Sequence, residues 1–153
     1  MGLVYRPMAD SLEFGINYRQ IYGQTETSPW KPENRPHVNV TLRAKFFNLD
    51  VSNGSRLEYS NPENRSEFWC YGNKFAIRLP LQAASLKVQP YVSHDIFVDF
   101  GDSNFARNGF SSGASVKLSQ NLVGDFYYRC QTSRYGDVWR DVKMLGTSLR
   151  YRF

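Results

Sequence analysis

Hydrophobic and polar residues alternate one by one along most of this chain. Between Val38 and Phe46 every second position is Val, Leu, Ala or Phe, and Asn, Thr, Arg and Lys lie between them. Because successive side chains of a β-strand point to opposite faces, this period of two predicts strands with one apolar and one polar face. The pattern recurs in eight segments, and none predicts a helix: Leu12–Arg19, Val38–Phe46, Arg56–Tyr59, Trp69–Leu79, Leu86–Asp99, Phe110–Leu118, Leu122–Arg129 and Leu145–Phe153.

The links between these segments alternate between long and short. The long ones are 22–36, 60–66, 100–107 and 133–141, and the short ones are 48–50, 80–84 and 119–121. In an antiparallel meander this order puts every long link at one end, as in outer-membrane barrels with short periplasmic turns and longer extracellular loops. The whole chain, residues 1–153, is therefore predicted to be a single domain, an antiparallel up-and-down transmembrane β-barrel of about eight strands.

The strands of a soluble barrel also alternate apolar and polar residues, with the apolar face turned inward. The residues on the polar face must therefore distinguish a soluble barrel from a membrane barrel. Here that face carries arginines and carboxylates interleaved with Gly and Ser. Arginine binds carboxylates bidentately and small residues leave room for it, which suits a narrow polar interior filled by side chains. The alternative is a set of charges on a solvated face. The predicted lumen network comprises Arg19, Arg43, Arg56, Glu58, Arg78, Asp95, Asp99, Asp125, Arg129, Arg150 and Arg152.

Composition agrees with a strand-rich protein at a membrane. Aromatic residues make up 16% of the chain, and many lie near the ends of the predicted strands, where two interfacial girdles would be. Core packing explains single aromatics equally well. The apolar faces run over roughly nine to eleven residues, enough for a tilted strand to cross a bilayer, and no segment approaches the roughly 18 apolar residues of a membrane helix.

Charge and cysteine content narrow the possible partners. The net charge is +5, but the 19 Lys and Arg residues are spread singly along the chain, so no nucleic-acid partner is expected. Cys70 and Cys130 match no metal or redox spacing. Strand parity places Cys70 in the lumen and Cys130 toward lipid, which favours free thiols over a disulfide. The two histidines are dispersed as well, so neither a metal nor another cofactor is expected.

One local motif invites an enzymatic interpretation. Ser93, His94 and Asp95 are consecutive, and nucleophilic catalysis needs such groups within hydrogen-bonding reach. Neighbours in a strand point to opposite faces, so Ser93 and Asp95 cannot share a face with His94. No catalytic residue is therefore assigned, and the protein is not expected to be an enzyme.

Two features fit a closed eight-stranded barrel poorly. Pro90 lies inside a predicted strand, where it removes a ladder hydrogen bond, so a bulge is expected there. The segment GLVYRPMADSLEFGINYRQ reads as the end of one strand, a tight turn and a full strand. That reading suggests a fragment or redesign of a larger barrel.

The last strand, LGTSLRYRF, has Tyr151 and Phe153 on its apolar face. It resembles the terminal signal of bacterial outer-membrane barrels, which the assembly machinery of that membrane reads. The segments PYVSHDIFVDFGDSNFARNGFSSGASVKLSQNLVGDFYYRCQTSR and WRDVKMLGTSLRYRF, with NGSRLEY at Asn53–Tyr59, resemble an uncharacterised bacterial family of outer-membrane barrels known only as a domain of unknown function. The resemblance covers about Asn34–Phe153. It implies a barrel in the bacterial outer membrane, but no activity or site.

The sequence thus predicts a small monomeric outer-membrane barrel that is structural or surface-interacting. Its partners would be the lipid bilayer and the outer-membrane assembly machinery. Recognition would belong to the long loops containing Trp30, Phe105 and Trp139. Three alternatives remain open: a soluble lipocalin-like barrel that binds an apolar ligand, an outer-membrane lipid-modifying enzyme, and a narrow pore.

Overall fold

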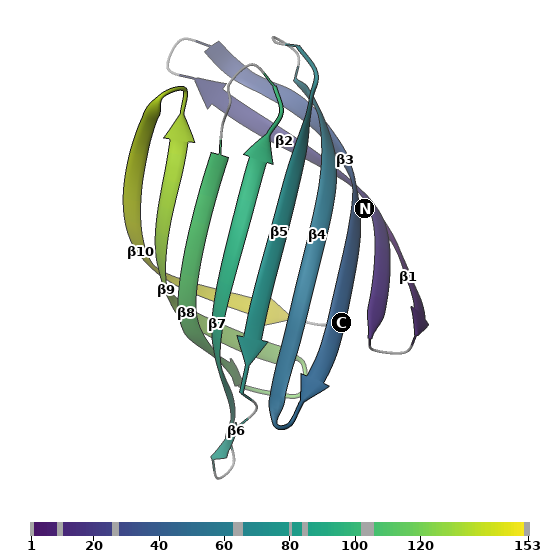
Figure 1. Ribbon diagram of the computed structural model, residues 1–153, viewed down its shortest axis with the longest axis vertical. Coiled ribbons are helices and arrows are strands. Elements are labelled where there is room, and N and C mark those ends of the chain that lie inside the picture. Colours follow the sequence, from purple (N-terminus) through teal and green to yellow (C-terminus); the bar gives the residue numbers. More distant parts are fainter. Residues whose placement is uncertain are drawn as a thin grey trace.

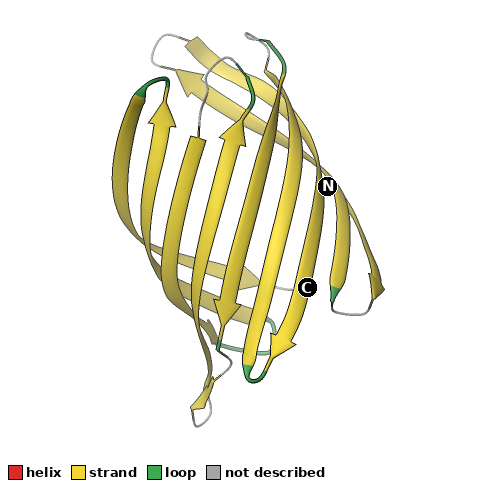
Figure 2. Ribbon diagram, viewed as in Figure 1, coloured by secondary structure: helices red, strands yellow, loops and turns green. Residues whose placement is uncertain are grey.

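The structure, a computed structural model, describes residues 2–8, 11–25, 28–62, 66–79, 81–83, 86–101 and 106–151. Side chains are described in the same ranges except at 23–25, 28–31, 82–83, 86 and 135. Figure 2 shows only strands and connecting loops in these ranges, and no helix there is long and apolar enough to cross a membrane. The strands are β1 (Gly2–Met8), β2 (Leu12–Thr25), β3 (Ser28–Phe46), β4 (Leu49–Pro62), β5 (Phe68–Arg78), β6 (Leu81–Ala83), β7 (Leu86–Asp99), β8 (Ala106–Lys117), β9 (Leu122–Tyr135) and β10 (Val138–Tyr151).

All of these strands belong to one antiparallel sheet. Nine follow one another in the order β1-β2-β3-β4-β5-β7-β8-β9-β10, and the short β6 pairs with β7 beside this path. The sheet curves strongly, so that the lower part of β10 passes behind the front strands (Figure 1). The predicted all-β antiparallel meander is confirmed. Among the residues described, no ladder joins β1 to β10, so the sheet is not closed into the predicted barrel.

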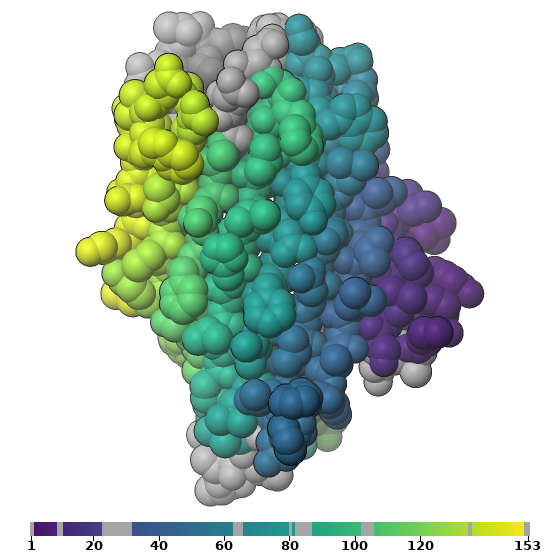
Figure 3. All heavy atoms as spheres, viewed as in Figure 1, coloured from purple at the N-terminus to yellow at the C-terminus, as the bar shows by residue number. Residues whose placement is uncertain are grey.

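The strand count exceeds the prediction of eight because residues 2–8 form a strand of their own. β1 pairs with β2 through Leu3 opposite Ile16 and Tyr5 opposite Phe14, and the register shifts between Tyr5 and Met8. In the space-filling view these N-terminal strands stand out from the body at one edge (Figure 3). Both strands that the sequence indicated in this segment are therefore present and paired.

Two of the predicted long links are largely strand. β2 continues to Thr25 and β3 begins at Ser28, inside the segment 22–36 that was expected to be a loop. At the other site, 133–141, β9 and β10 meet at a two-residue turn, Gly136–Asp137. Pro, Asn and Gly in these segments predicted loops, but cross-strand pairing carries each hairpin outward past them.

Pro90 causes an interruption and not the expected bulge. It lies opposite Ala114 in an unshifted β7–β8 register, and its carbonyl accepts a hydrogen bond of 2.9 Å from the Leu79 amide. On its other side, Arg78 pairs with Tyr91 and Leu81 with Val88, so β5 and β6 follow the same register. β5 and β6 thus lie in one line along β7, and the ladder is interrupted at Leu79, because Pro90 opposite it has no amide hydrogen to donate.

Burial is the reverse of that in a soluble globular protein. Among the described residues, the buried hydrophobic side chains are Phe68, Cys70 and Ala76. The buried polar residues are more numerous: Glu58, Ser60, Ser93, Asp99, Ser111, Ser115, Asp125 and Ser133. Large apolar side chains such as Leu145, at 88% exposure, cover the outside. Polar groups therefore fill the concave side of the sheet and apolar groups its convex side.

Candidate functional site: the polar interior of the sheet

The concave face borders a partly open cavity of about 840 Å³. It is lined by side chains from β2 to β5 and from β7 to β10, including six cationic side chains and three carboxylates. Three groups of ion pairs divide the interior, and a fourth lies where β1 turns into β2. Each is built from side chains of strands that are adjacent in the sheet or separated by one strand.

Glu58 on β4 is the centre of the first group. It is 0% exposed, and its carboxylate accepts hydrogen bonds from Arg35 at 2.8 Å and Arg19 at 3.0 Å. Arg56 adds an ion pair at 3.5 Å. Arg35 also donates to Glu33 at 2.9 Å, so this pair of neighbouring carboxylates is held among three guanidinium groups. Such charge-assisted contacts compensate for the desolvation of a fully buried carboxylate.

Asp95 on β7 and Arg129 on β9 form the second group, across the width of β8. The two guanidinium nitrogens contact the two carboxylate oxygens at 2.5 and 2.8 Å, which is the bidentate geometry that arginine favours. Ser111 and Gln131 accept further hydrogen bonds from the same guanidinium at 3.4 and 3.2 Å. Gly109 gives this guanidinium its room, because a Cβ there would overlap it.

Asp125 on β9 is the centre of the third group. Arg150 on β10 donates two hydrogen bonds to it, at 3.0 and 3.1 Å, and Ser148 donates one at 3.3 Å. The hydroxyl of Ser115 on β8 also donates to this carboxylate. Near the β1–β2 turn, Glu13 completes the fourth group with Arg6 at 2.9 Å and Arg43 at 3.2 Å.

Seven members of the predicted lumen network lie in these interior pairs: Arg19, Arg56, Glu58, Asp95, Asp125, Arg129 and Arg150. Arg43 pairs with Glu13, outside the predicted set. Arg78 donates to the Ser52 hydroxyl at 3.4 Å, and Asp99 accepts the Gly101 amide at 2.7 Å. Arg152 lies outside the described residues.

The sequence prediction missed Glu13, Glu33 and Arg35. Glu33 and Arg35 lie in the segment 22–36, which was assigned to a loop because of its prolines. The alternation of the chain could have revealed them, because Arg35 and His37 fall on every second position in line with the polar face of the strand that begins at Val38. Glu13 shared the polar face of its strand but was not selected.

The predicted loop and terminal residues fall in different places. Trp139 lies in β10 and not in a loop; the residue is 57% exposed, and the Arg134 guanidinium is 6.0 Å from the centroid of its ring. Trp30 belongs to β3, but its side chain is not described. Tyr151 ends β10 opposite Leu122 and is 57% exposed. Phe105 and Phe153 lie outside the described residues.

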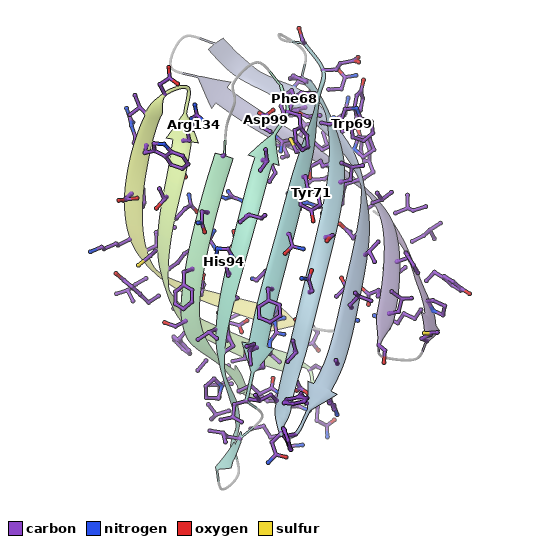
Figure 4. The ribbon with its side chains drawn as sticks, viewed as in Figure 1. Phe68, Trp69, Tyr71, His94, Asp99 and Arg134 are labelled. Carbon is purple, nitrogen blue, oxygen red and sulfur yellow. The ribbon has the colours of Figure 1, made fainter. Side chains whose placement is uncertain are left out.

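The triplet around His94 divides between the two faces. Ser93 is buried at 2% exposure and Asp95 binds Arg129 in the interior. His94 lies on the outer face, where its Nε2 is 2.7 Å from the Asn108 side-chain oxygen (Figure 4). Cys70 is buried, Cys130 is exposed, and both are free thiols. In the described part of the chain, no group of three or more His, Cys, Asp or Glu could hold a metal ion.

Fold and interior define an all-β protein with a curved antiparallel sheet and a polar, ion-paired concave face. The chain belongs to the family of proteins of unknown function called DUF2490, whose sequence model matches residues 1–141. The match confirms membership of an uncharacterised domain family, and it reaches further toward the N-terminus than the resemblance from Asn34. No curated protein and no solved structure matches the chain.

Proposed function

We propose that this protein is a small barrel of the bacterial outer membrane, monomeric, with a structural or surface-interacting role. The reversed burial carries the proposal. Exposed large apolar side chains on a soluble protein are a liability when they form a continuous face, but a lipid bilayer requires such a face. The concave side, with Glu58 and Asp125 buried, is what a polar lumen needs.

Strand length supports the same function. β4, β7, β9 and β10 are each 14 residues long, β8 has 12 and β5 has 11. A tilted transmembrane strand needs about 9–11 residues. Each of these strands is thus long enough to cross the bilayer.

Aromatic residues at both ends of the sheet add support. Toward the end where β9 meets β10, Tyr59 and Trp69 lie side by side with ring centroids 5.2 Å apart. At the opposite end, Phe46 and Phe47 meet edge to face at 4.6 Å, and Phe47 is 89% exposed at a turn with φ of 52°. Glycine would adopt this φ more easily. Exposed aromatic rings at both ends of the sheet suit residues that contact the membrane interface.

A sheet in a membrane cannot leave the backbone groups of its two edge strands, β1 and β10, unpaired. Unpaired backbone groups cost several kcal/mol each in hydrocarbon, so membrane sheets are closed. β1 and β10 must therefore be paired in the bilayer, with each other or with further strands. Cross-linking a cysteine at Leu3 to one at Leu149 in the membrane-inserted protein would detect direct closure.

Partition and gel migration test the proposal together. Protein refolded in detergent should migrate differently in unheated and boiled gel samples, as folded membrane barrels do, and should enter liposomes. A protein that stays monodisperse without detergent would exclude the membrane function and favour a soluble barrel.

The cavity favours one second candidate, a narrow pore. Its volume of about 840 Å³ leaves space between the ion pairs that a fully plugged interior would not. Steps of conductance in a planar bilayer would support the pore, and a silent bilayer containing inserted protein would support the structural role.

A further inference from the structure

The positive charges in the cavity are not fully matched by carboxylates. Six cationic side chains and three carboxylates line it. Arg129 and Arg150 are matched by Asp95 and Asp125, and Arg56 contacts Glu58. The Arg107 guanidinium lies over the Phe97 ring, 5.2 Å from its centroid. Arg78 and Lys74, both on β5, line the same cavity and form no ion pair with a described residue. A local excess of positive charge therefore faces the space on the β5 side.

Ser93 lies between the two unpaired cations in the sheet, opposite the middle of the segment that joins Lys74 to Arg78. Ser93 lines the cavity and is 2% exposed, and its buried side-chain oxygen has no hydrogen-bond partner among the described atoms. A buried hydroxyl without a partner costs free energy, so such groups usually meet a ligand or water. Ser93 can both donate and accept a hydrogen bond.

The sheet register brings these three groups together. Ser93 lies directly opposite Ala76, which is two residues from Lys74 on one side and two from Arg78 on the other. Diagonal neighbours across a strand pair are about 7–8 Å apart, within reach of long side chains. Ala76 is small and buried at 2% exposure, so no bulky side chain of β5 lies between the two cations on this face.

The carboxylates directly opposite Lys74 and Arg78 in the sheet do not neutralise them. Asp95 lies opposite Lys74, but both of its oxygens contact the Arg129 guanidinium. Asp50 lies opposite Arg78 and forms no ion pair with it. Two cations and one unpartnered hydroxyl around open space are the donors that an oxyanion requires.

We infer that the interior holds a binding site for a small oxyanion of phosphate size, formed by Lys74, Arg78 and Ser93. Arg78 supplies a planar fork of donors, Lys74 a mobile charge and Ser93 a hydroxyl donor. The site concerns the concave face alone, so it goes beyond the membrane proposal and does not depend on it. Failure of liposome insertion would leave the site intact, and failure of anion binding would leave the barrel intact.

Calorimetric titration with inorganic phosphate tests the site, in buffer or detergent according to which keeps the protein monodisperse. Sodium chloride at equal ionic strength serves as the reference anion. Saturable binding at one phosphate per chain is expected. Lys74→Gln and Arg78→Gln should each weaken it by about tenfold, because each removes a charge-assisted hydrogen bond. Ser93→Ala should weaken it severalfold.

Lys117→Gln is the matched control. It removes the same charge from an exposed lysine that does not line the cavity, so phosphate affinity should be unchanged. Arg78→Lys should keep more of the affinity than Arg78→Gln, and unheated gel migration checks that each variant is folded. Absence of saturable binding to the folded wild-type protein would overturn the site. Equal weakening by Lys117→Gln would also overturn it, because the attraction would then be that of a basic protein in general.

Discussion

At the scale of single residues, two glycines of the interior differ in what surrounds them. A Cβ on Gly113 would overlap the Phe126 carbonyl oxygen and lie 2.8 Å from the Tyr127 Cβ. At Gly54 the nearest atom, the Thr41 hydroxyl oxygen, would be 3.5 Å away, which is ordinary contact. The difference separates a glycine that the packing requires from one that it tolerates.

Gly113→Ala should therefore lower the free energy of unfolding by about 1–3 kcal/mol, because main chain and a neighbouring strand must move. Gly54→Ala should leave it within about 0.5 kcal/mol. Denaturant unfolding of both variants measures the difference. Equal losses would mean that strand glycines matter here through backbone entropy and not through contact.

Glu58 offers a second prediction, because three arginines depend on one carboxylate. Glu58→Gln should destabilise the protein by about 3 kcal/mol, since the guanidinium groups lose their counter-charge in a buried site. Arg35 is the most affected, with 18% of its side chain exposed. Denaturant unfolding measures this change as well.

Asp137→Asn is the control for Glu58→Gln. Asp137 also pairs with an arginine, Arg134 at 3.2 Å, but its side chain is 100% exposed. A surface pair of this kind contributes less than about 1 kcal/mol, so little change is expected. If both variants lost the same free energy, burial of the Glu58 cluster would not be what makes it important.

At the scale of elements, the β9–β10 hairpin depends on its turn. Its ladder runs unbroken from Val138 opposite Tyr135 to Tyr151 opposite Leu122. Gly136, the first turn residue, has φ of 58°, and no neighbouring atom would meet a Cβ there. A positive φ at this position is what hairpin turns that match the strand twist require.

Gly136→Ala should consequently cost about 1–2 kcal/mol through backbone strain alone. The loss should appear as faster amide hydrogen exchange in the upper part of β10, while β4 and β5 keep their protection. Asp137→Asn, one residue further on, should leave the exchange of β10 unchanged. An unaffected Gly136→Ala hairpin would show that the ladder, and not the turn, sets its stability.

At the scale of the whole molecule, replacing an exposed leucine should affect stability differently if the convex face contacts lipid than if it contacts water. Leu145 is 88% exposed in the middle of β10. In water, replacing so exposed a leucine should change stability by less than about 0.5 kcal/mol. In a bilayer, arginine near the midplane costs about 2–4 kcal/mol.

Leu145→Arg should therefore destabilise the protein in lipid vesicles by about 2–4 kcal/mol. Val138→Arg, next to the hairpin turn, should have little effect, because in the proposed membrane orientation the end of the hairpin would lie beyond the bilayer core. Unfolding of both variants in liposomes compares them directly. No loss for Leu145→Arg in vesicles would contradict the proposal that the convex face meets lipid.

Much of the fold was open to prediction because alternation is a local property. Val38, Val40 and Leu42 share a face in any strand that contains them, and antiparallel neighbours follow from short links. Strand ends were harder to predict. Trp139 and Arg35 were assigned to loops because nearby turn residues outweighed the pairing that only a partner strand supplies.

The sequence by itself determined that the chain is an antiparallel meander and which residues share each face, since both depend on neighbours along the backbone. Tertiary structure alone decided which charges meet. Arg19 reaches Glu58 across 39 residues, and Arg129 reaches Asp95 across 34. Register and curvature set these distances, and they are also why Glu58 has three arginines while Lys74 and Arg78 face open space.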